Sequence, residues 1–284
     1  MRDRPDPLSA TAARLRALVA GFPDTFTVET TVPDEPGWWR LDTVPVAQWC
    51  ADAVVRDNPR RLASVAAMSV GAAVTHAVLA RVTAALVLDA RAWDIAAAAL
   101  VVHRASAGHL DRVALRDPVA WVVAGDVGVD PAAARVFPTE AALVDAVAAA
   151  AVGTLHPLLG AVRAATRLGL VPLWNAVADT VRLTADQVPR YAGRRAAPAF
   201  ADALLDALVA HGAPIRSRGV DQPLPGRAER MPVRASCCFA FRTDPPVARP
   251  SDALCTSCPL LPAAERARRY VAFVDGIPAT VPVR

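Results

Sequence analysis

The segment from Leu62 to Ala80 contains nineteen residues without a charged side chain, and it constrains the fold more than any other stretch. A run of this length approaches the about 20 apolar residues that a membrane-spanning helix needs. Ala, Ser, Thr and Gly fill much of it, His76 lies within it, and Arg81 follows at once. We therefore predict a helix that is buried in the protein core rather than a membrane span.

The apolar residues of the chain are mostly small. Hydrophobic residues make up 54% of the 284 residues, largely Ala, Val and Leu, whereas aromatic residues make up only 5%. A chain of this length can bury a sizeable core in one large or two modest domains, and so high an apolar content argues against wholesale disorder. Much of that core must therefore consist of small aliphatic side chains.

The positively charged side chains are all arginines, because the sequence contains no lysine. This absence excludes P-loop nucleotide hydrolysis, Schiff-base catalysis, protein-kinase chemistry and acylation by a Ser-x-x-Lys pair, each of which needs a lysine. The formal net charge is only +4, and no basic stripe is interleaved with aromatic residues. We therefore expect no nucleic-acid partner.

Helical periodicity dominates the chain, with one short region of β character. We predict an α+β fold, that is, a predominantly helical body with a small antiparallel sheet and a C-terminal segment that carries cysteines. The predicted strands are 25–32, 121–123 and a hairpin of 99–104 with 112–116. The predicted helices are 9–20, 45–56, 60–88 with a break near Gly71, 140–151, 157–169, 172–186, 196–211 and 263–274.

A polar stretch rich in Pro, Gly and Arg separates the helical region from the C-terminal cysteines. Such a composition is typical of loops and linkers. We therefore predict a mainly helical body over residues 1–212, a linker over residues 213–232, and a C-terminal segment over residues 233–284. The first residues lack the apolar region of a secretory signal, so we expect a cytoplasmic protein.

Four of the five cysteines lie in the last fifty residues, as Cys237-Cys238 and Cys255-x-x-Cys258. Structural disulfides are rare in cytosolic proteins, so grouped cysteines indicate metal or redox chemistry. Adjacent side chains alternate along a strand, so Cys237 and Cys238 need a turn or kink to face one centre. Four thiolates can hold an iron–sulfur cluster or a structural zinc ion, and unligated redox thiols are a third alternative. We favour an iron–sulfur cluster, because each iron of a [2Fe–2S] centre needs only two protein sulfurs.

The sequence around these cysteines resembles a known family. The stretch Ser236-Cys237-Cys238-Phe239-Ala240-Phe241-Arg242, followed later by Cys255-Thr256-Ser257-Cys258-Pro259-Leu260, resembles the C-terminus of the FhuF-type ferric-siderophore reductase family. That family has an aromatic and a basic residue after the Cys-Cys pair, and then a Cys-x-x-Cys-Pro-Leu motif. The resemblance is specific over Arg234 to Leu261. Sixteen residues separate the two cysteine pairs here, which is a longer gap than the family usually has.

The resemblance implies a cofactor and an activity. It implies a [2Fe–2S] cluster held by Cys237, Cys238, Cys255 and Cys258, in a C-terminal cluster-binding segment. It also implies an oxidoreductase that reduces siderophore-bound ferric iron by one electron and releases ferrous iron in iron uptake. This reaction belongs to the cytoplasmic side of the membrane, so we expect a peripheral membrane contact. No flavin or nicotinamide signature is present, so we expect an external electron donor.

Three side chains are candidates for contact with the ferric siderophore. Arg234 and Arg242 flank the first cysteine pair and could attract an anionic chelate. Trp174 lies on an apolar helix, where it could form a wall of the chelate pocket or pack in the core. No catalytic side chain is assigned. Two other functions are compatible with the same residues, namely a siderophore-binding or structural module with zinc in the four-cysteine site, and a plain [2Fe–2S] electron carrier.

Overall fold

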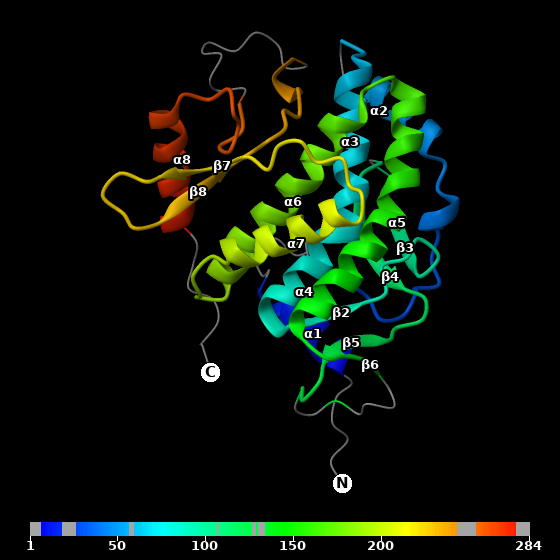
Figure 1. Cartoon of the computed structure of the whole chain (residues 1–284). Helices are drawn as coiled ribbons and strands as arrows, with labels where there is room; N and C mark the ends of the chain where they lie inside the picture. The colour runs from blue at the N-terminus through cyan, green and yellow to red at the C-terminus, as the bar shows by residue number, and fades with distance from the viewer. Residues whose placement is uncertain are drawn as a thin grey trace.

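The computed structural model of the chain describes residues 7–18, 27–56, 60–106, 108–126, 129, 134–242 and 254–276. It has the predicted α+β fold, with a bundle of helices and three small sheets (Figure 1). The helices are α1 (Pro7–Leu18), α2 (Val46–Arg56), α3 (Ala63–Thr75), α4 (Arg81–Asp89), α5 (Glu140–Thr166), α6 (Leu170–Tyr191), α7 (Pro198–Ala210) and α8 (Ala263–Asp275). Shorter helical elements are η1 (Leu41–Thr43), η2 (His76–Ala80) and η4 (Ala240–Arg242).

The sheets are small and lie at the edges of the helical body. One is antiparallel in the order β1-β3-β4, and it contains the predicted hairpin. The second is mixed in the order β2-β5-β6, with β5 parallel to β6. The third is the hairpin β7-β8, which lies beside α8 in Figure 1. The strands are β1 (Trp38–Arg40), β2 (Arg91–Trp93), β3 (Leu100–Arg104), β4 (Leu110–Leu115), β5 (Ala120–Val123), β6 (Ala134–Phe137), β7 (Val220–Pro223) and β8 (Arg230–Val233).

The uncharged segment forms a buried helix, as predicted. Helix α3 continues through the π-helical turn η2 into α4 without the break expected near Gly71. Gly71 instead allows close packing, because an added Cβ would lie 2.8 Å from Cδ2 of Leu173. The irregularity falls at His76, where the π-helix begins, and such π-helical turns occur often at functional sites.

Two helical runs are long and apolar enough to meet the length and composition criteria for a membrane span. They are Ala63–Asp89, which is 78% buried within the protein over its apolar window, and Glu140–Thr166, which is 50% buried. Core helices of soluble proteins satisfy the same criteria. The burial of the first run agrees with its place at the centre of the bundle.

The two helices predicted over 140–151 and 157–169 are a single helix, α5, with Pro157 in its interior. A proline there removes one helical hydrogen bond and normally kinks or ends a helix. Pro157 and Gly153 are both on the exposed side of α5, however, where water can satisfy the free carbonyl group. Leu155 and Leu158 are buried on the other side and hold the helix in place.

Two further predictions differ from the structure. The strand predicted over 25–32 is reduced to an isolated bridge between Glu29 and Ala114, and residues 25–26 lie outside the described residues. The stretch 213–232, predicted as a linker, contains the β7-β8 hairpin. Gly219 makes this hairpin possible, because its φ is +75° and a Cβ there would lie 2.1 Å from the Val233 oxygen. No sequence periodicity marks strands as short as these.

Candidate functional site

A buried carboxylate on α6 holds the chain directly before the first cysteine pair. Oδ1 of Asp179 accepts a hydrogen bond from the Ala235 amide at 2.6 Å, and Oδ2 accepts one from the Ser236 amide at 3.0 Å. The Ser236 hydroxyl donates to the same carboxylate. Burial raises the pKa of Asp179, and the hydrogen bonds from Ser236 and Ala235 oppose that rise. Asp179 therefore fixes the backbone from which Cys237 and Cys238 project.

The second cysteine segment is joined to the first by backbone hydrogen bonds. The Arg234 amide donates to the Ser257 oxygen at 3.0 Å, within the Cys255–Cys258 turn. The amide of Cys258 donates to the oxygen of Cys255 at 2.9 Å and closes that turn. The two cysteine pairs, which are far apart in the sequence, are thereby brought side by side.

Helix α8 ties the second cysteine segment to the body. The Arg266 guanidinium donates to the Cys258 oxygen at 2.6 Å and to Oε1 of Gln222 at 2.7 Å. The hydroxyl of Tyr270 donates to Asp186 on α6. Leu224, Met231, Ala267 and Tyr270 form a small apolar cluster of their own beneath this helix. The cysteine segment therefore rests on α6, on α8 and on the β7-β8 hairpin.

The four thiols are close enough to affect one another's ionisation, because Cys238 and Cys258 both act on Cys237 and on Cys255. Phe239 has a left-handed backbone with φ of 59°, and its amide donates to Sγ of Cys237 at 3.4 Å. This backbone kink follows the Cys-Cys pair, and an amide donor to sulfur of this kind is one of the contacts that tune cluster potentials.

The ionisation of these thiols reflects their crowding. Burial raises the pKa of Cys237, and the neighbouring thiols raise it further. The hydrogen bond with Cys238 and burial raise the pKa of Cys255, whereas the charge of Arg234 lowers it. Such thiols become thiolates readily only when a cation stabilises the negative charge.

The donor set can be tested against the two metal alternatives. Within the described part of the chain, no three His, Cys, Asp or Glu side chains have the mutual spacing of ligands to one metal ion. A zinc ion would need all four sulfurs around a single point. A [2Fe–2S] centre needs two thiolates on each of two irons. The preference for a [2Fe–2S] centre therefore rests on the sequence resemblance around the cysteines and not on the positions of the thiols.

A cavity of about 420 Å³ adjoins the thiol of Cys238. Helices α3 and α6, the turn η2 and the Arg234–Cys238 segment form its walls. Nε of Arg234 is buried there and has no hydrogen-bond partner among the described residues. Polar side chains make up much of the lining, namely His76, Asp179, Thr180, Thr184, Gln187, Arg234 and Ser236.

His76 enters this cavity from the π-helical turn. Burial lowers its pKa to about 3, and the charge of Arg81 contributes to the shift. The imidazole is therefore neutral over the whole physiological pH range. A neutral histidine presents one nitrogen donor and one nitrogen acceptor to a ligand.

The three predicted substrate residues have different surroundings. Arg234 lines the cavity beside Cys238. Arg242 is exposed at the end of η4, and its guanidinium lies 6.0 Å from the ring centroid of Phe239. Trp174 is completely buried in the core on α6 and is not among the residues that line the cavity beside Cys238. This burial corrects the pocket-wall prediction and matches the core-packing alternative.

Five residues that line this cavity were not predicted from the sequence, namely His76, Asp179, Thr180, Thr184 and Gln187. The last four share one face of α6, because they are separated by helical spacings of 1, 4 and 3 residues. A polar stripe on an otherwise apolar amphipathic helix was the available signal. The signal for His76 was weaker. It is the sole ionisable side chain in the uncharged segment from Leu62 to Ala80.

Cys50 lies apart from this site, in α2, and is only 2% exposed. Burial raises its pKa to about 11. At pH 8 only about one thiol in a thousand would be ionised, and the thiolate is the reactive form. We therefore expect Cys50 to resist iodoacetamide in the native protein and to react fully in 6 M guanidinium, as measured by peptide mass spectrometry. Rapid labelling of Cys50 in the native protein would contradict the burial.

Comparisons with protein-family models, with curated proteins and with solved structures found no match to this chain.

Proposed function

We propose that the protein is an iron–sulfur ferric-siderophore reductase. The observation that carries the proposal is the position of Cys238, one of four neighbouring thiols, in the wall of a polar cavity. Cys237, Cys238, Cys255 and Cys258 would hold a [2Fe–2S] cluster, which supplies one electron at a time. The resemblance to the FhuF-type family at the same residues supports the same conclusion.

The cavity residues would bind and orient the ferric chelate. Ferric iron is held by hard oxygen donors such as hydroxamate, catecholate or carboxylate, and many such chelates are anionic. The guanidinium of Arg234, whose Nε has no hydrogen-bond partner among the described residues, can donate a charge-assisted hydrogen bond. The acceptor would be one of the chelate oxygens that bind the iron. Thr180, Thr184 and Gln187 add neutral hydrogen-bonding groups. After reduction the oxygen ligands hold ferrous iron poorly, so the metal can leave without any bond of the chelator being broken.

The presence of a cavity beside Cys238 favours a reductase over a plain electron carrier. A carrier needs only an exposed edge of its cofactor, whereas a reductase for a bulky chelate needs a recess that positions the iron. The cavity beside Cys238 is that recess. Its volume of about 420 Å³ admits part of a chelate rather than the whole of a large one, so the remainder would stay in solvent.

The experiment that tests the proposal is a single-turnover reaction. Protein reconstituted with iron and sulfide, and reduced anaerobically, is mixed with a ferric siderophore and a ferrous-specific chromogenic trap. We expect the protein to reoxidise and about one trapped ferrous ion to appear for each electron lost. NADPH alone should not sustain turnover, because the sequence has no nicotinamide or flavin signature.

The variant Arg234→Gln is expected to slow reduction of anionic chelates about tenfold, from the loss of one charge-assisted hydrogen bond. Arg268→Gln, on the exposed side of α8, is the matched control and should leave the rate unchanged. Equal rates for all chelates of matched potential would favour the plain electron carrier. Failure of every ferric siderophore to oxidise an intact reduced protein would remove the reductase proposal.

A further inference from the structure

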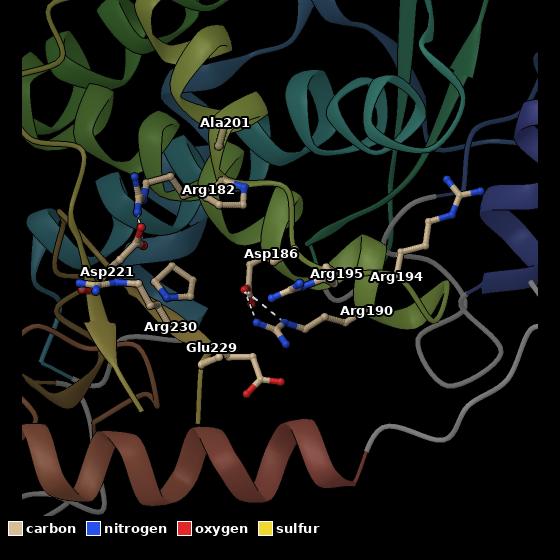
Figure 2. Close-up of a pocket in the computed structure, with 13 residues that line it drawn as sticks. Arg182, Asp186, Arg190, Arg194, Arg195, Ala201, Asp221, Glu229 and Arg230 are labelled. Atoms are coloured by element: carbon tan, nitrogen blue, oxygen red, sulfur yellow. Dashed lines mark hydrogen bonds and ion pairs between the residues drawn. The ribbon is translucent and has the colours of Figure 1, made fainter. Parts of the chain in front are cut away.

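A second cleft, of about 290 Å³, lies between the C-terminal part of α6, the start of α7 and the β7-β8 hairpin (Figure 2). It shares no lining residue with the cavity beside Cys238. Nothing in the proposed reductase function uses it. Its charged lining comprises Arg182, Asp186, Arg190, Arg194, Arg195, Asp221, Glu229 and Arg230.

The lining carries more positive than negative charge, with five arginines against three acidic residues. Asp186 is paired with Arg190 at 3.0 Å and also accepts the Tyr270 hydroxyl, so its oxygens are already engaged. Asp221 is paired with Arg182. Arg195 has no ion-pair partner within the described ranges, and Figure 2 shows its guanidinium turned toward Asp186 and Arg190. Glu229 supplies the third negative charge of the lining, so the five arginines leave the cleft with a net formal charge of +2.

Arg182 is the most enclosed of these arginines. Its side chain is only 10% exposed, and its Nε is buried without a hydrogen-bond partner in the described structure. Arg230 donates one hydrogen bond to the Asp221 backbone oxygen at 2.6 Å. This oxygen carries no formal charge, so the contact does not neutralise the Arg230 guanidinium. Buried donors without acceptors are uncommon in native proteins, so they indicate where an acceptor is missing.

The N-terminus of α7 contributes a further positive potential. Ala197 is the N-cap and provides no side-chain hydrogen bond, Pro198 has no amide hydrogen, and the Ala201 amide donates to the Ala197 oxygen, so the uncapped amides of the first turn are those of Ala199 and Phe200. Ala196, Pro198 and Ala201, around that terminus, line the cleft. Uncapped amides and the helix dipole both favour an anion at such an end. The helix terminus and the arginines therefore converge on one cleft.

We infer that this cleft binds a small organic phosphate ester. The phosphate would lie between Arg195, Arg230 and the start of α7, because guanidinium groups pair with phosphate oxygens through two hydrogen bonds. The organic part would contact the apolar wall formed by Ala201, Ala228 and Pro232. The cleft volume suits one small ring with its phosphate group. The inference does not depend on the proposed reductase function, and it needs no metal.

The test is calorimetric titration of the full chain with phenyl phosphate, in chloride buffer at constant ionic strength and pH 7.5. We expect saturable binding with one site per chain. Arg195→Gln should weaken it at least tenfold, and Arg195→Lys should retain part of the affinity by keeping the charge. Arg195 is exposed and makes no ion pair in the described structure, so its substitution should leave the melting temperature of the free protein unchanged.

Arg268→Gln again serves as the control, because it removes an arginine that does not line the cleft. Three results would overturn the inference. The first is the absence of saturable binding up to 10 mM phenyl phosphate, and the second is an equal loss of affinity in Arg195→Gln and Arg268→Gln. The third is an affinity for benzoate equal to that for phenyl phosphate, which would show that the cleft binds any organic anion. Inorganic phosphate alone should bind more weakly than phenyl phosphate, because it lacks the apolar contact.

Discussion

We expect the iron–sulfur absorption to be lost or severely reduced when serine replaces any one of Cys237, Cys238, Cys255 and Cys258. The variant Cys50→Ala is expected to leave this absorption intact. Protein made under iron-replete anaerobic conditions should be red-brown, with about two irons and two acid-labile sulfides per chain. The four thiols lie close enough to affect one another's ionisation. A hydroxyl in place of one of them offers iron a harder and less readily ionised donor.

The four variants can be compared directly by visible absorption and by EPR after one-electron reduction. The wild type should be EPR-silent as isolated and EPR-active when reduced. Cys50 is buried in α2 and belongs to the main core, so Cys50→Ala should cost modest stability and no colour. Bleaching by Cys50→Ala alone would show that the ligand set is wrong. Stoichiometric zinc without sulfide in the wild type would favour the zinc module.

Asp179→Ala is expected to release the cysteine segment from the body. Asp179 accepts three hydrogen bonds, two from backbone amides and one from a hydroxyl. Hydrogen bonds to a charged group are worth about 1.5–3 kcal/mol each, and truncation leaves buried donors unsatisfied. We expect a loss of about 3 kcal/mol or more in the free energy of unfolding, together with poor retention of iron and sulfide.

Urea denaturation of the apoprotein measures the first effect, and iron content after gel filtration measures the second. Asp202→Ala is the matched control, because Asp202 is 54% exposed and makes one ion pair at 3.3 Å. Asp202→Ala should change the unfolding free energy by less than about 1 kcal/mol. Equal destabilisation by the two variants, or full iron retention in Asp179→Ala, would contradict the anchoring role of Asp179.

Much of the helical body could be predicted from the sequence, because helical periodicity and burial agree in α2 and α6. The hairpin β3-β4 was also predicted correctly, from two β-rich runs around Gly108. Sequence rules for single helices, turns and linkers gave wrong predictions where contacts between distant segments determine the local structure. Pro157 is tolerated because its side of α5 faces solvent, and 213–232 is ordered because Asp221 and Gln222 find partners on α6 and α8.

The candidate site was predictable only in part. Cysteine spacing named four residues on two segments that a backbone hydrogen bond from Arg234 to Ser257 joins. The cavity beside them is built by α3, η2 and α6, which are remote in sequence, so no spacing could reveal it. Trp174 illustrates the converse error, because an aromatic residue on an amphipathic helix looks the same whether it faces a ligand or the core.

The anchoring of the cysteine segment on α6 has a consequence for how the protein would acquire iron. The main core of the body contains none of the four cysteines in the C-terminal pairs, and the segment that carries them packs against it through Asp179 and Asp186. Helix α6 is also synthesised before either cysteine pair. A newly made chain would therefore complete its body, and form a docking surface for the thiols, without any metal. If the protein holds the proposed cluster, insertion of that cluster would be a late maturation step on a preformed acceptor, and iron starvation would leave stable, unloaded protein rather than misfolded chains.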